Sequence, residues 1–366
     1  MGELSGLARE SLRDIAPYRP GKPIAEVQRE LGLSDVIKMA SNENLFGPSP
    51  RASAAAREAV AEMHYYPDAD CYLLREALAG LWGVPRESLV FGSGSDEVVR
   101  LLGQAFLQEG DEAVVPDPSF PGYLPAVQGP GATPRVVPLR RFRLDLEAMA
   151  ACFGPRTRMV FLCNPNNPTG TIVEQEETEL FLARLPERAI LVVDEAYGEY
   201  VDSEDFPWGI EMFRRGLPVV VLRTFSKVYG LAGLRLGYAV APPEIAEGIN
   251  RIRPVFNANV IAQQAALAAV EDRAHVEKVK ELTRAARLTL YKELDSRGIE
   301  YVPSETNFIL VRLGDAGGAS QALMRRGVIV RPADFFGYPE WIRVTVGPPS
   351  YQERFLTALD AFREQA

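Results

Sequence analysis

The sequence is poor in the residues on which several classes of protein depend. Its 366 residues include only two histidines, His64 and His275, and three cysteines, Cys71, Cys152 and Cys163, without a CxxC spacing. Histidine is the usual base of a nucleophilic relay and a common metal ligand, and paired cysteines form disulfides or bind zinc. Because His64 precedes a proline turn and His275 lies in a charged helical pattern, we expect no histidine relay, no metal site and no disulfide framework.

Positive charge and long apolar runs are also lacking. The chain has 49 acidic and 40 basic side chains, a net charge of −9, which repels the phosphate backbone of nucleic acids. No run approaches the roughly 18 apolar residues that a membrane span needs, and the first residues, MGELSGLARESLRD, lack the apolar core of a signal peptide. The protein is therefore expected to bind neither nucleic acid nor membrane. Because its three cysteines are also expected to be reduced thiols, a cytoplasmic location is expected.

Short apolar runs alternate with helical patterns along most of the chain. The runs cover residues 88–92, 112–116, 158–163, 189–194, 218–223 and 236–241. Several are apolar throughout, as is typical of strands that are buried on both faces. The segment between the first two carries an apolar stripe at helical spacing. Strands that alternate with helices predict an α/β fold, with a mostly parallel central sheet flanked by helices.

The pattern changes in the last third of the chain. A long helical region over 257–297 is followed by TNFILVRL at 306–313 and by further short strands and helices, which together predict an α+β unit. The length is more than twice the roughly 150 residues of an ordinary domain. We predict an N-terminal arm over 1–45, a large α/β domain over 46–270, and a small α+β domain over 271–366 to which the arm contributes.

Polar residues follow the predicted strands, at the ends where open α/β sheets bind ligands. The first strand leads into GSGSDEVV, a glycine turn at a helix start whose free N–H groups suit a phosphate; Glu97 in the third position of GxGxxG weakens a dinucleotide interpretation. The other strand ends carry the proline-locked turn NPNNPTG with Asn167, then Asp194 and Tyr197, then Ser226, Lys227 and Arg235.

Each of these pieces alone has an ordinary structural explanation, as a turn, a helix cap or a surface lysine. Together they supply a lysine amine for a Schiff base, an aspartate for a pyridinium nitrogen, and a serine, an arginine and a helix terminus for a phosphate. These are the parts that an enzyme dependent on pyridoxal phosphate requires. The combination predicts a site for this cofactor.

In their order along the chain, the motifs resemble those of a known family. SNENLFGPSP, YPD, NPNNPTG, DEAY, SKVYGLAGLRLG, ETNF and IRVTVG are similar to the motifs of fold-type I pyridoxal phosphate aminotransferases, over nearly the whole sequence. Within that superfamily the sequence is most similar to histidinol-phosphate aminotransferases. The resemblance implies transamination of L-histidinol phosphate with 2-oxoglutarate, which gives imidazole acetol phosphate and L-glutamate in histidine biosynthesis.

The resemblance also implies a role for each cofactor residue. Lys227 would bind pyridoxal 5′-phosphate through its amine and carry the substrate proton, and Asp194 would keep the pyridine nitrogen protonated. Asn167 and Tyr197 would hydrogen-bond the phenolic oxygen. The remaining contacts would be Ser95, Asp96, Thr224, Ser226 and Arg235 around the phosphate, and Phe120 against the ring, where many relatives carry tyrosine.

Substrate contacts and a homodimer follow from the same resemblance. Arg331 and Arg343 would bind the anionic end of the substrate, because the planar guanidinium fork suits carboxylate and phosphate alike. Tyr18 and Asn44 would lie near the substrate phosphate. Tyr66 would reach the cofactor phosphate of the neighbouring subunit, so that two subunits share each active site.

Two other reactions on the same fold remain open at this point. An aromatic amino acid aminotransferase would need a pocket similar to one for imidazole. A threonine-phosphate decarboxylase would likewise bind a phosphate through arginine. A DNA-binding regulator on this fold is not expected, because the acidic charge is wrong for it.

Overall fold

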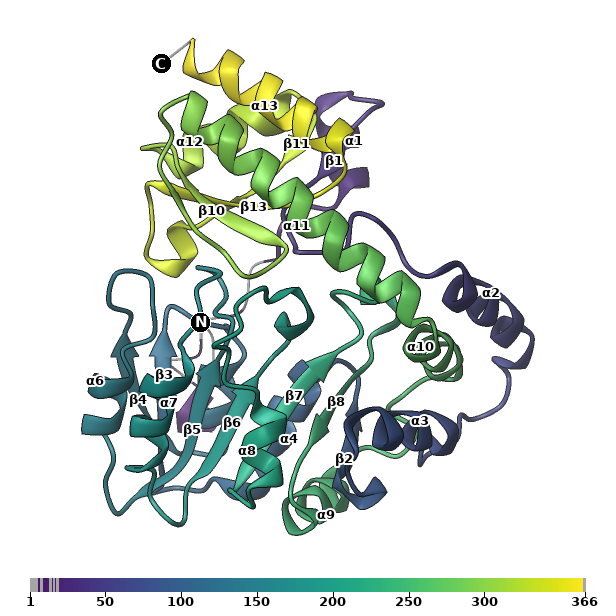
Figure 1. Ribbon diagram of the computed structural model, residues 1–366, viewed down its shortest axis with the longest axis vertical. Coiled ribbons are helices and arrows are strands. Elements are labelled where there is room, and N and C mark those ends of the chain that lie inside the picture. Colours follow the sequence, from purple (N-terminus) through teal and green to yellow (C-terminus); the bar gives the residue numbers. More distant parts are fainter. Residues whose placement is uncertain (1–5, 7–8, 13–14, 16, 18–19, 365–366) are drawn as a thin grey trace.

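The computed structural model describes residue 6, residues 9–12, residues 15 and 17, and residues 20–364. These residues form a large body and a small body, which Figure 1 shows below and above. The large body contains a seven-stranded sheet, and the small body contains a four-stranded sheet and a two-stranded one. Among the described residues, no helix combines the length and apolar character needed to cross a membrane.

The seven-stranded sheet has the strand order β2-β8-β7-β6-β5-β3-β4. Its strands are β2 (Leu89–Gly92), β3 (Glu112–Asp117), β4 (Thr133–Pro138), β5 (Thr157–Cys163), β6 (Ile190–Asp194), β7 (Val219–Thr224) and β8 (Gly237–Val240). The pairings from β4 through β7 are parallel, and β8 is antiparallel to both of its neighbours. The mostly parallel α/β sheet is thus confirmed, and the six strands expected from the apolar runs are present.

Helices cover both faces of this sheet (Figure 1). One face packs against α3 (Tyr72–Trp82), α6 (Leu146–Ala151), α7 (Gln175–Leu182), α8 (Gly209–Arg214) and α10 (Val260–Glu271), with α2 (Pro50–Ala59) beside α10. The other packs against α4 (Ser95–Phe106), α5 (Tyr123–Gln128) and α9 (Pro243–Ile252). Within β6, Leu191 and Val193 enter the first apolar core and Val192 enters the second. This two-sided burial explains why the strand is apolar throughout.

The small body is built on antiparallel strands. Its sheet has the order β12-β13-β10-β9, formed by β9 (Tyr301–Val302), β10 (Phe308–Arg312), β12 (Arg331–Pro332) and β13 (Trp341–Thr345). Helices α12 (Ala316–Arg325) and α13 (Pro349–Arg363) pack near it, and β11 (Val328–Ile329) pairs in parallel with β1 (Ile37–Lys38), which follows α1 (Ile24–Leu31). A segment from early in the chain therefore completes the small body.

Helix α11 (Arg273–Ser296) connects the two bodies (Figure 1). Val276 and Val279, near its start, pack into the core of the large body, while Leu290 and Leu294 pack into the core of the small one. The domain boundaries expected at 45/46 and 270/271 remain a prediction. The short 3-10 helices are η2 (Glu10–Leu12), η3 (Val60–Glu62), η4 (Arg86–Ser88), η5 (Gly198–Tyr200), η6 (Ala232–Leu234) and η7 (Asp334–Phe336).

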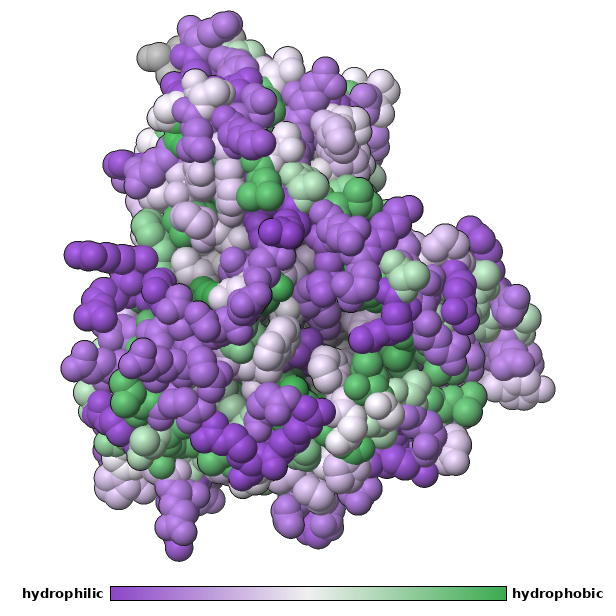
Figure 2. All heavy atoms as spheres, in the orientation of Figure 1, coloured by the Kyte–Doolittle hydropathy of each residue, from purple (hydrophilic) through white to green (hydrophobic). Residues whose placement is uncertain are grey.

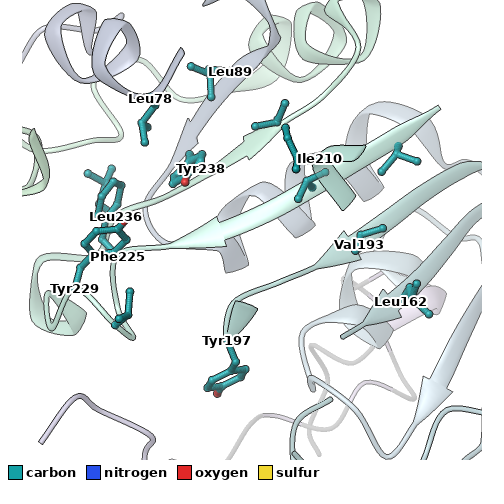
Figure 3. Packing of buried hydrophobic residues seen from close by; sticks show 14 of the residues in the cluster. Leu78, Leu89, Leu162, Val193, Tyr197, Ile210, Phe225, Tyr229, Leu236 and Tyr238 are labelled. Atoms are coloured by element: carbon teal, nitrogen blue, oxygen red, sulfur yellow. The ribbon is translucent and has the colours of Figure 1, made fainter. Parts of the chain in front are cut away.

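The carboxyl ends of the central strands lie where the two bodies meet. Figure 3 shows Tyr197 beyond the end of the strand that carries Val193, at the edge of the apolar core to which both residues belong. Hydrogen bonds from this edge reach β13 of the small body: Arg343 donates to Asn167, and Asn42 links Tyr197 to Thr345. Several of the predicted site residues, including Asn167, Tyr197 and Arg343, therefore lie at the junction of the two bodies.

Candidate active site

A buried carboxylate closes β6. The Asp194 side chain is only 5% exposed, and its Oδ2 accepts a hydrogen bond of 2.7 Å from the hydroxyl of Tyr123 on α5. Its Oδ1 accepts from the backbone N–H of Ala196 at 3.1 Å. Burial raises the pKa of Asp194, and the two hydrogen bonds and the nearby Lys227 amine oppose that rise. The carboxylate is therefore held in one orientation, ready to share a proton with a basic ring nitrogen.

Lys227 lies in the turn after β7, half-buried. Its Nζ is 3.5 Å from the carbonyl oxygen of Ser41 and 5.3 Å from the centre of the Tyr197 ring. Burial lowers the pKa of Lys227 to about 8, with a further lowering from the Arg343 charge and an opposing effect from Glu43. A lysine with a depressed pKa is more often neutral near pH 7, and only the neutral amine is a nucleophile or a base.

Tyr197 is held by a residue from the start of the chain. Its hydroxyl oxygen accepts a hydrogen bond of 2.9 Å from Nδ2 of Asn42, whose own backbone N–H donates to Oγ1 of Thr345 at 3.0 Å. Burial raises the pKa of Tyr197 to about 12, so the phenol keeps its proton at neutral pH. Since the oxygen already accepts from Asn42, the phenolic proton can be donated to a bound molecule.

Asn167 and Arg343 meet from the two bodies. Arg343, in the middle of β13, donates through Nη1 to Oδ1 of Asn167 and through Nη2 to the carbonyl of Ala40 at 3.0 Å. Because Oδ1 of Asn167 is taken by Arg343, its amide nitrogen is the atom that can donate to a ligand. The guanidinium also lies near the rings of Phe308 and Phe336, with Cζ at 5.3 and 5.7 Å from their centres.

Two glycines bring a guanidinium and a strand against the start of α4. A Cβ on Gly94, the N-cap residue with φ of 82°, would lie 2.3 Å from Nη2 of Arg235. A Cβ on Gly237 would lie 2.3 Å from the backbone nitrogen of Ser95. Only glycine therefore lets Arg235 approach the free N–H groups of this helix terminus, where backbone dipoles favour an anion.

Hydroxyl groups complete this anion site at the start of α4. We call the site, formed around Gly94, Ser95 and Arg235, the cradle. Arg235 Nη1 is 3.4 Å from Oγ of Ser226, and the backbone N–H of Ser226 donates to Oγ1 of Thr224 at 3.1 Å. The Asp96 carboxylate pairs with Arg100 at 3.1 Å, so the backbone N–H is the part of Asp96 left for an anion. The predicted residues Ser95, Asp96, Thr224, Ser226 and Arg235 thus come together at one end of α4.

Phe120 lies beside the cradle. The ring is half-buried and meets Tyr123 edge-on at 5.4 Å between centres, and a Cβ on Gly122 would come within 2.4 Å of the Phe120 ring and 2.7 Å of the Asp96 carboxylate. Phe120 and Asp96 are therefore neighbours. Phe120 thus lies next to both Asp96, at the start of α4, and Tyr123, the partner of Asp194.

Arg331 stands directly opposite Arg343 in the small body. The antiparallel register of β12 and β13 pairs the two residues, and both side chains are more than nine-tenths buried. Arg331 Cζ lies 5.9 Å from the centre of the Phe335 ring, and a Cβ on Gly21 would be 3.7 Å from its Nη1. Adjacent buried guanidinium groups make this face of the sheet strongly positive.

Comparison with known proteins identifies the family. Residues 34–359 match the family model for aminotransferase class I and II. The chain belongs to this family. It is 50% identical over 353 residues to the histidinol-phosphate aminotransferase of Moorella thermoacetica, covering 96% of this chain and 92% of the relative.

Solved structures agree with this assignment. The histidinol-phosphate aminotransferase of Sinorhizobium meliloti in complex with pyridoxal-5′-phosphate is 28% identical, with a TM-score of 0.86 over 99% of this chain and 100% of that one. The L-threonine-O-3-phosphate decarboxylase of Porphyromonas gingivalis, 23% identical over 90% of this chain and 100% of that one, shares the fold with a TM-score of 0.79.

The aminotransferase has a donor set that fits pyridoxal phosphate. The glycine-lined cradle with Arg235 suits a phosphate group, because a Cβ on Gly94 would enter it. Asp194 suits a pyridine nitrogen, and the Tyr197 hydroxyl and Asn167 amide suit a phenolic oxygen. The described residues hold no group of three or more histidine, cysteine or acidic side chains placed to bind a metal ion.

Two residues expected at the site, Tyr66 and Asn44, stand apart from this group, and a third is not among the described residues. Tyr66 is 83% exposed and stacks on Phe256 at 4.7 Å between ring centres. The Asn44 amide donates to the carbonyls of Gly47 and Val228, at 3.1 and 2.9 Å, and so fixes the loop beside Lys227. Tyr18 lies outside the described residues.

Sequence reasoning overlooked two residues of the aminotransferase site, Tyr123 and Asn42. Tyr123 ends the segment DPSFPGY, whose predicted site residue is Phe120, and Asn42 belongs to SNEN, whose predicted site residue is Asn44. An aromatic residue with a polar tip three positions after a ring-stacking residue was the available signal for Tyr123. No such signal separated Asn42 from Asn44.

Proposed function

We propose that this aminotransferase moves the amino group of L-histidinol phosphate to 2-oxoglutarate with pyridoxal 5′-phosphate as cofactor. The products are imidazole acetol phosphate and L-glutamate, a step of histidine biosynthesis. The observation that carries the proposal is the convergence of a buried carboxylate (Asp194), an amine of lowered pKa (Lys227) and a guanidinium cradle (Arg235). The choice of substrate is supported by the close relative from Moorella thermoacetica.

When bound, the cofactor supplies an electron-accepting ring that stabilises negative charge on the substrate Cα. Lys227 would hold the cofactor through its amine and, as a neutral amine, would accept the proton from the substrate Cα. Asp194 would keep the ring nitrogen protonated, and Tyr123 holds its carboxylate in place. Tyr197 and Asn167 would donate to the phenolic oxygen, and Phe120 would contact the ring.

Substrate recognition is assigned to Arg331 and Arg343. Their guanidinium forks donate paired hydrogen bonds to the phosphate of one substrate and the carboxylate of the other, so one positive face can accept both in turn. The relative from Moorella thermoacetica is a histidinol-phosphate aminotransferase, which does not favour an aromatic amino acid aminotransferase. The likeness to the threonine-phosphate decarboxylase extends to the fold alone.

A homodimer completes the proposed site. Tyr66 and Phe256 stack on the surface, and Met63, Tyr65 and Val255 expose about 70% of their side chains nearby in the chain (70%, 68% and 69%). Figure 2 shows hydrophobic residues gathered over the region where Figure 1 places α3 and α10. A second copy of the chain would bury this surface and bring Tyr66 to the neighbouring cradle. The three free thiols support a cytoplasmic location.

The proposal is tested by the visible absorbance of the purified holoenzyme. L-histidinol phosphate, phenylalanine, threonine phosphate and glutamate are added separately, and conversion of the cofactor to its amine form is followed. We expect conversion by histidinol phosphate and glutamate at low concentration and by phenylalanine only at much higher concentration. Preference for phenylalanine, or release of carbon dioxide from threonine phosphate, would contradict the proposal.

A further inference from the structure

A buried ionic cluster lies directly behind the site, and the proposed chemistry does not use it. Arg223 on β7 is only 2% exposed, and its guanidinium pairs with the carboxylates of Glu195 and Glu199. The Nη1 atom is 3.1 Å from Oε1 of Glu199, and Nη2 forms a close hydrogen bond with Oε2 of Glu195, which is fully buried. The cluster lies among the apolar side chains on one face of the large sheet.

Two tryptophan rings also contact the guanidinium. Its Cζ lies 4.5 Å from the centre of the Trp82 ring and 5.3 Å from that of Trp208. Trp82 is itself held by a hydrogen bond of 2.8 Å from Nε1 to the hydroxyl of Tyr238. Two aromatic contacts and two carboxylate partners together restrict where the planar cation can lie.

The surroundings leave little room for movement. The backbone N–H of Gly209 donates to Oε1 of Glu195 at 2.5 Å, so both carboxylate oxygens are used. A Cβ on Gly198 would lie 3.2 Å from Nη1 of Arg223 and 3.2 Å from the Trp208 ring. The cluster is therefore closely packed as well as fully hydrogen-bonded at Glu195.

Stability alone does not account for such a cluster. Removing charges from water costs free energy, and a buried ion pair can often be replaced by apolar side chains without loss of stability. The positions of the charged residues suggest another reason. Glu195 directly follows Asp194, and Glu199 comes two residues after Tyr197. Arg223 directly precedes Thr224 and stands four residues before Lys227.

The cluster therefore spans the two turns that carry the proposed site. The backbone N–H of Glu195 donates to the carbonyl of Leu222 at 3.1 Å, at the end of the pairing between β6 and β7. Past this point the two turns are connected through side chains. Arg223, just before the second turn, forms ion pairs with Glu195 and Glu199, which lie at the two ends of the first turn.

We propose that Arg223 is a positioning residue, which locks the turn carrying Asp194 and Tyr197 to the turn carrying Thr224, Ser226 and Lys227. It does not touch the reacting atoms. By pairing with Glu195 and Glu199 from behind, it keeps the pyridine-nitrogen side and the lysine side of the site in register. The inference rests on the proposed function, since it concerns the same cofactor site.

The test compares Arg223→Met and Arg223→Lys with Arg287→Met as a matched control. Arg287 on α11 is also buried, pairs with Asp202 at 2.5 Å and donates to the carbonyl of Thr306 at 2.8 Å. Asp202 lies three residues beyond Glu199, so this ion pair holds the chain after the first turn and does not connect the two turns to each other. Three quantities are measured on the holoenzymes: the rate at which pyridoxal phosphate is lost on dilution, the visible circular dichroism of the bound cofactor, and kcat with KM. Thermal unfolding reports the structural effect of each variant.

We expect Arg223→Met to speed cofactor loss, change the visible dichroism and lower kcat by up to about 100-fold, the effect of a displacement on the order of 1 Å. Arg223→Lys, which keeps the charge but not the fork, should fall between wild type and Arg223→Met. Arg287→Met should lower the melting temperature and leave all three cofactor readouts at wild-type values. If Arg223→Met does not fold, Arg223→Lys and Glu199→Gln decide by the same criteria.

The inference is overturned if the Arg223 variants change only the melting temperature, or if Arg287→Met alters the cofactor signals as much as they do. A wild-type protein that binds no pyridoxal phosphate would refute the proposed function and the inference with it. A wild-type protein that binds the cofactor, with normal cofactor signals in the Arg223 variants, would refute the inference alone.

Discussion

The phenol of Tyr123 donates a hydrogen bond of 2.7 Å to the buried carboxylate of Asp194, and its ring stacks on Phe161 at 4.5 Å between centres. The stacked ring fixes where the hydroxyl lies, and the hydroxyl fixes how the carboxylate is turned. The hydrogen bond also lowers the pKa of Asp194 against the rise caused by burial. Tyr123 therefore controls both the orientation and the ionisation of the group assigned to the cofactor nitrogen.

Replacing Tyr123 with phenylalanine should remove this control while keeping the stacked ring. Loss of a hydrogen bond to a charged group, about 1.5–3 kcal/mol, should lower kcat by roughly tenfold or more. Because the pKa of Asp194 then rises, the carboxylate becomes protonated at a higher pH as the solution is acidified. The acid limb of the kcat profile should move to higher pH.

Tyr200 offers the matched control for this substitution. Its ring is buried, and its hydroxyl has no hydrogen-bond partner among the residues that the structure describes. Tyr200→Phe therefore removes an equivalent oxygen without breaking a hydrogen bond, and kcat and its pH profile should stay unchanged. Equal effects of the two substitutions would contradict the role given to Tyr123.

The contrast between Asp194 and Tyr123 shows what could be predicted from the sequence. Asp194 ends an apolar run, and a polar residue at a strand end is visible in one dimension. Its partner Tyr123 is 71 residues away, and Asn42 is 155 residues from Tyr197. Such pairs depend on how the elements pack, which no local pattern records. The same holds for the register that sets Arg331 opposite Arg343.

Strand β4 was overlooked for a different reason. Its sequence, TPRVVP, contains Pro134 and Pro138, and most of its residues are exposed or partly exposed. Proline cannot donate to a sheet ladder and is tolerated in edge strands, where β4 lies. The apolar runs that predicted the inner strands reflect burial on two faces, and an edge strand lacks that burial.

Lys227→Met should abolish turnover and stabilise the cofactor-free protein at pH 7. Burial lowers the pKa of Lys227 from 10.5 to about 8, so the unfolded state binds the proton more tightly than the folded state. The destabilising contribution of Lys227 is present in full below pH 8, shrinks as the pH rises, and disappears above pH 10.5. For a half-buried amine we expect the substitution to add about 1–2 kcal/mol to the free energy of unfolding. Urea unfolding of the variant and the wild type at pH 7 and pH 10 measures this difference in the free energy of unfolding. A difference that is as large at pH 10 as at pH 7 would contradict this account.

Gly94→Ala should weaken cofactor binding by roughly tenfold or more, because the added Cβ would lie 2.3 Å from Nη2 of Arg235. Gly110 is the control: it has a similar φ of 91°, but a Cβ there would have no atom within 4 Å. Both substitutions carry the backbone strain of a positive φ, about 1–2 kcal/mol. Fluorescence titration of the cofactor-free variants with pyridoxal phosphate separates the two effects. Equal affinities in the two variants would show that the cradle is not where we place it.

Arg331→Met should raise KM for histidinol phosphate by about 10- to 100-fold, which corresponds to the roughly 1.5–3 kcal/mol of a hydrogen bond to a charged group. Cofactor affinity should not change. Arg312 in the same sheet is exposed and pairs with Glu300 and Glu340 at 2.9 and 3.2 Å, so Arg312→Met tests loss of an arginine that the site does not use. Steady-state kinetics on both variants decide the matter, and an unchanged KM in Arg331→Met would remove Arg331 from the substrate site.

The proposed exchange of Tyr66 between subunits can be tested by mixing two inactive proteins. Tyr66→Ala and Lys227→Met subunits are co-expressed with different tags, and the mixed dimers are compared with each parent. If Tyr66 serves the neighbouring site, a mixed dimer has one doubly defective site and one intact site. Activity should then return in about a quarter of all sites, because half of randomly formed dimers are mixed. If Tyr66 serves its own chain, each site of a mixed dimer keeps one defect and no activity returns. A parent Tyr66→Ala protein with full activity would show instead that Tyr66, 83% exposed in the single chain, takes no part in the reaction.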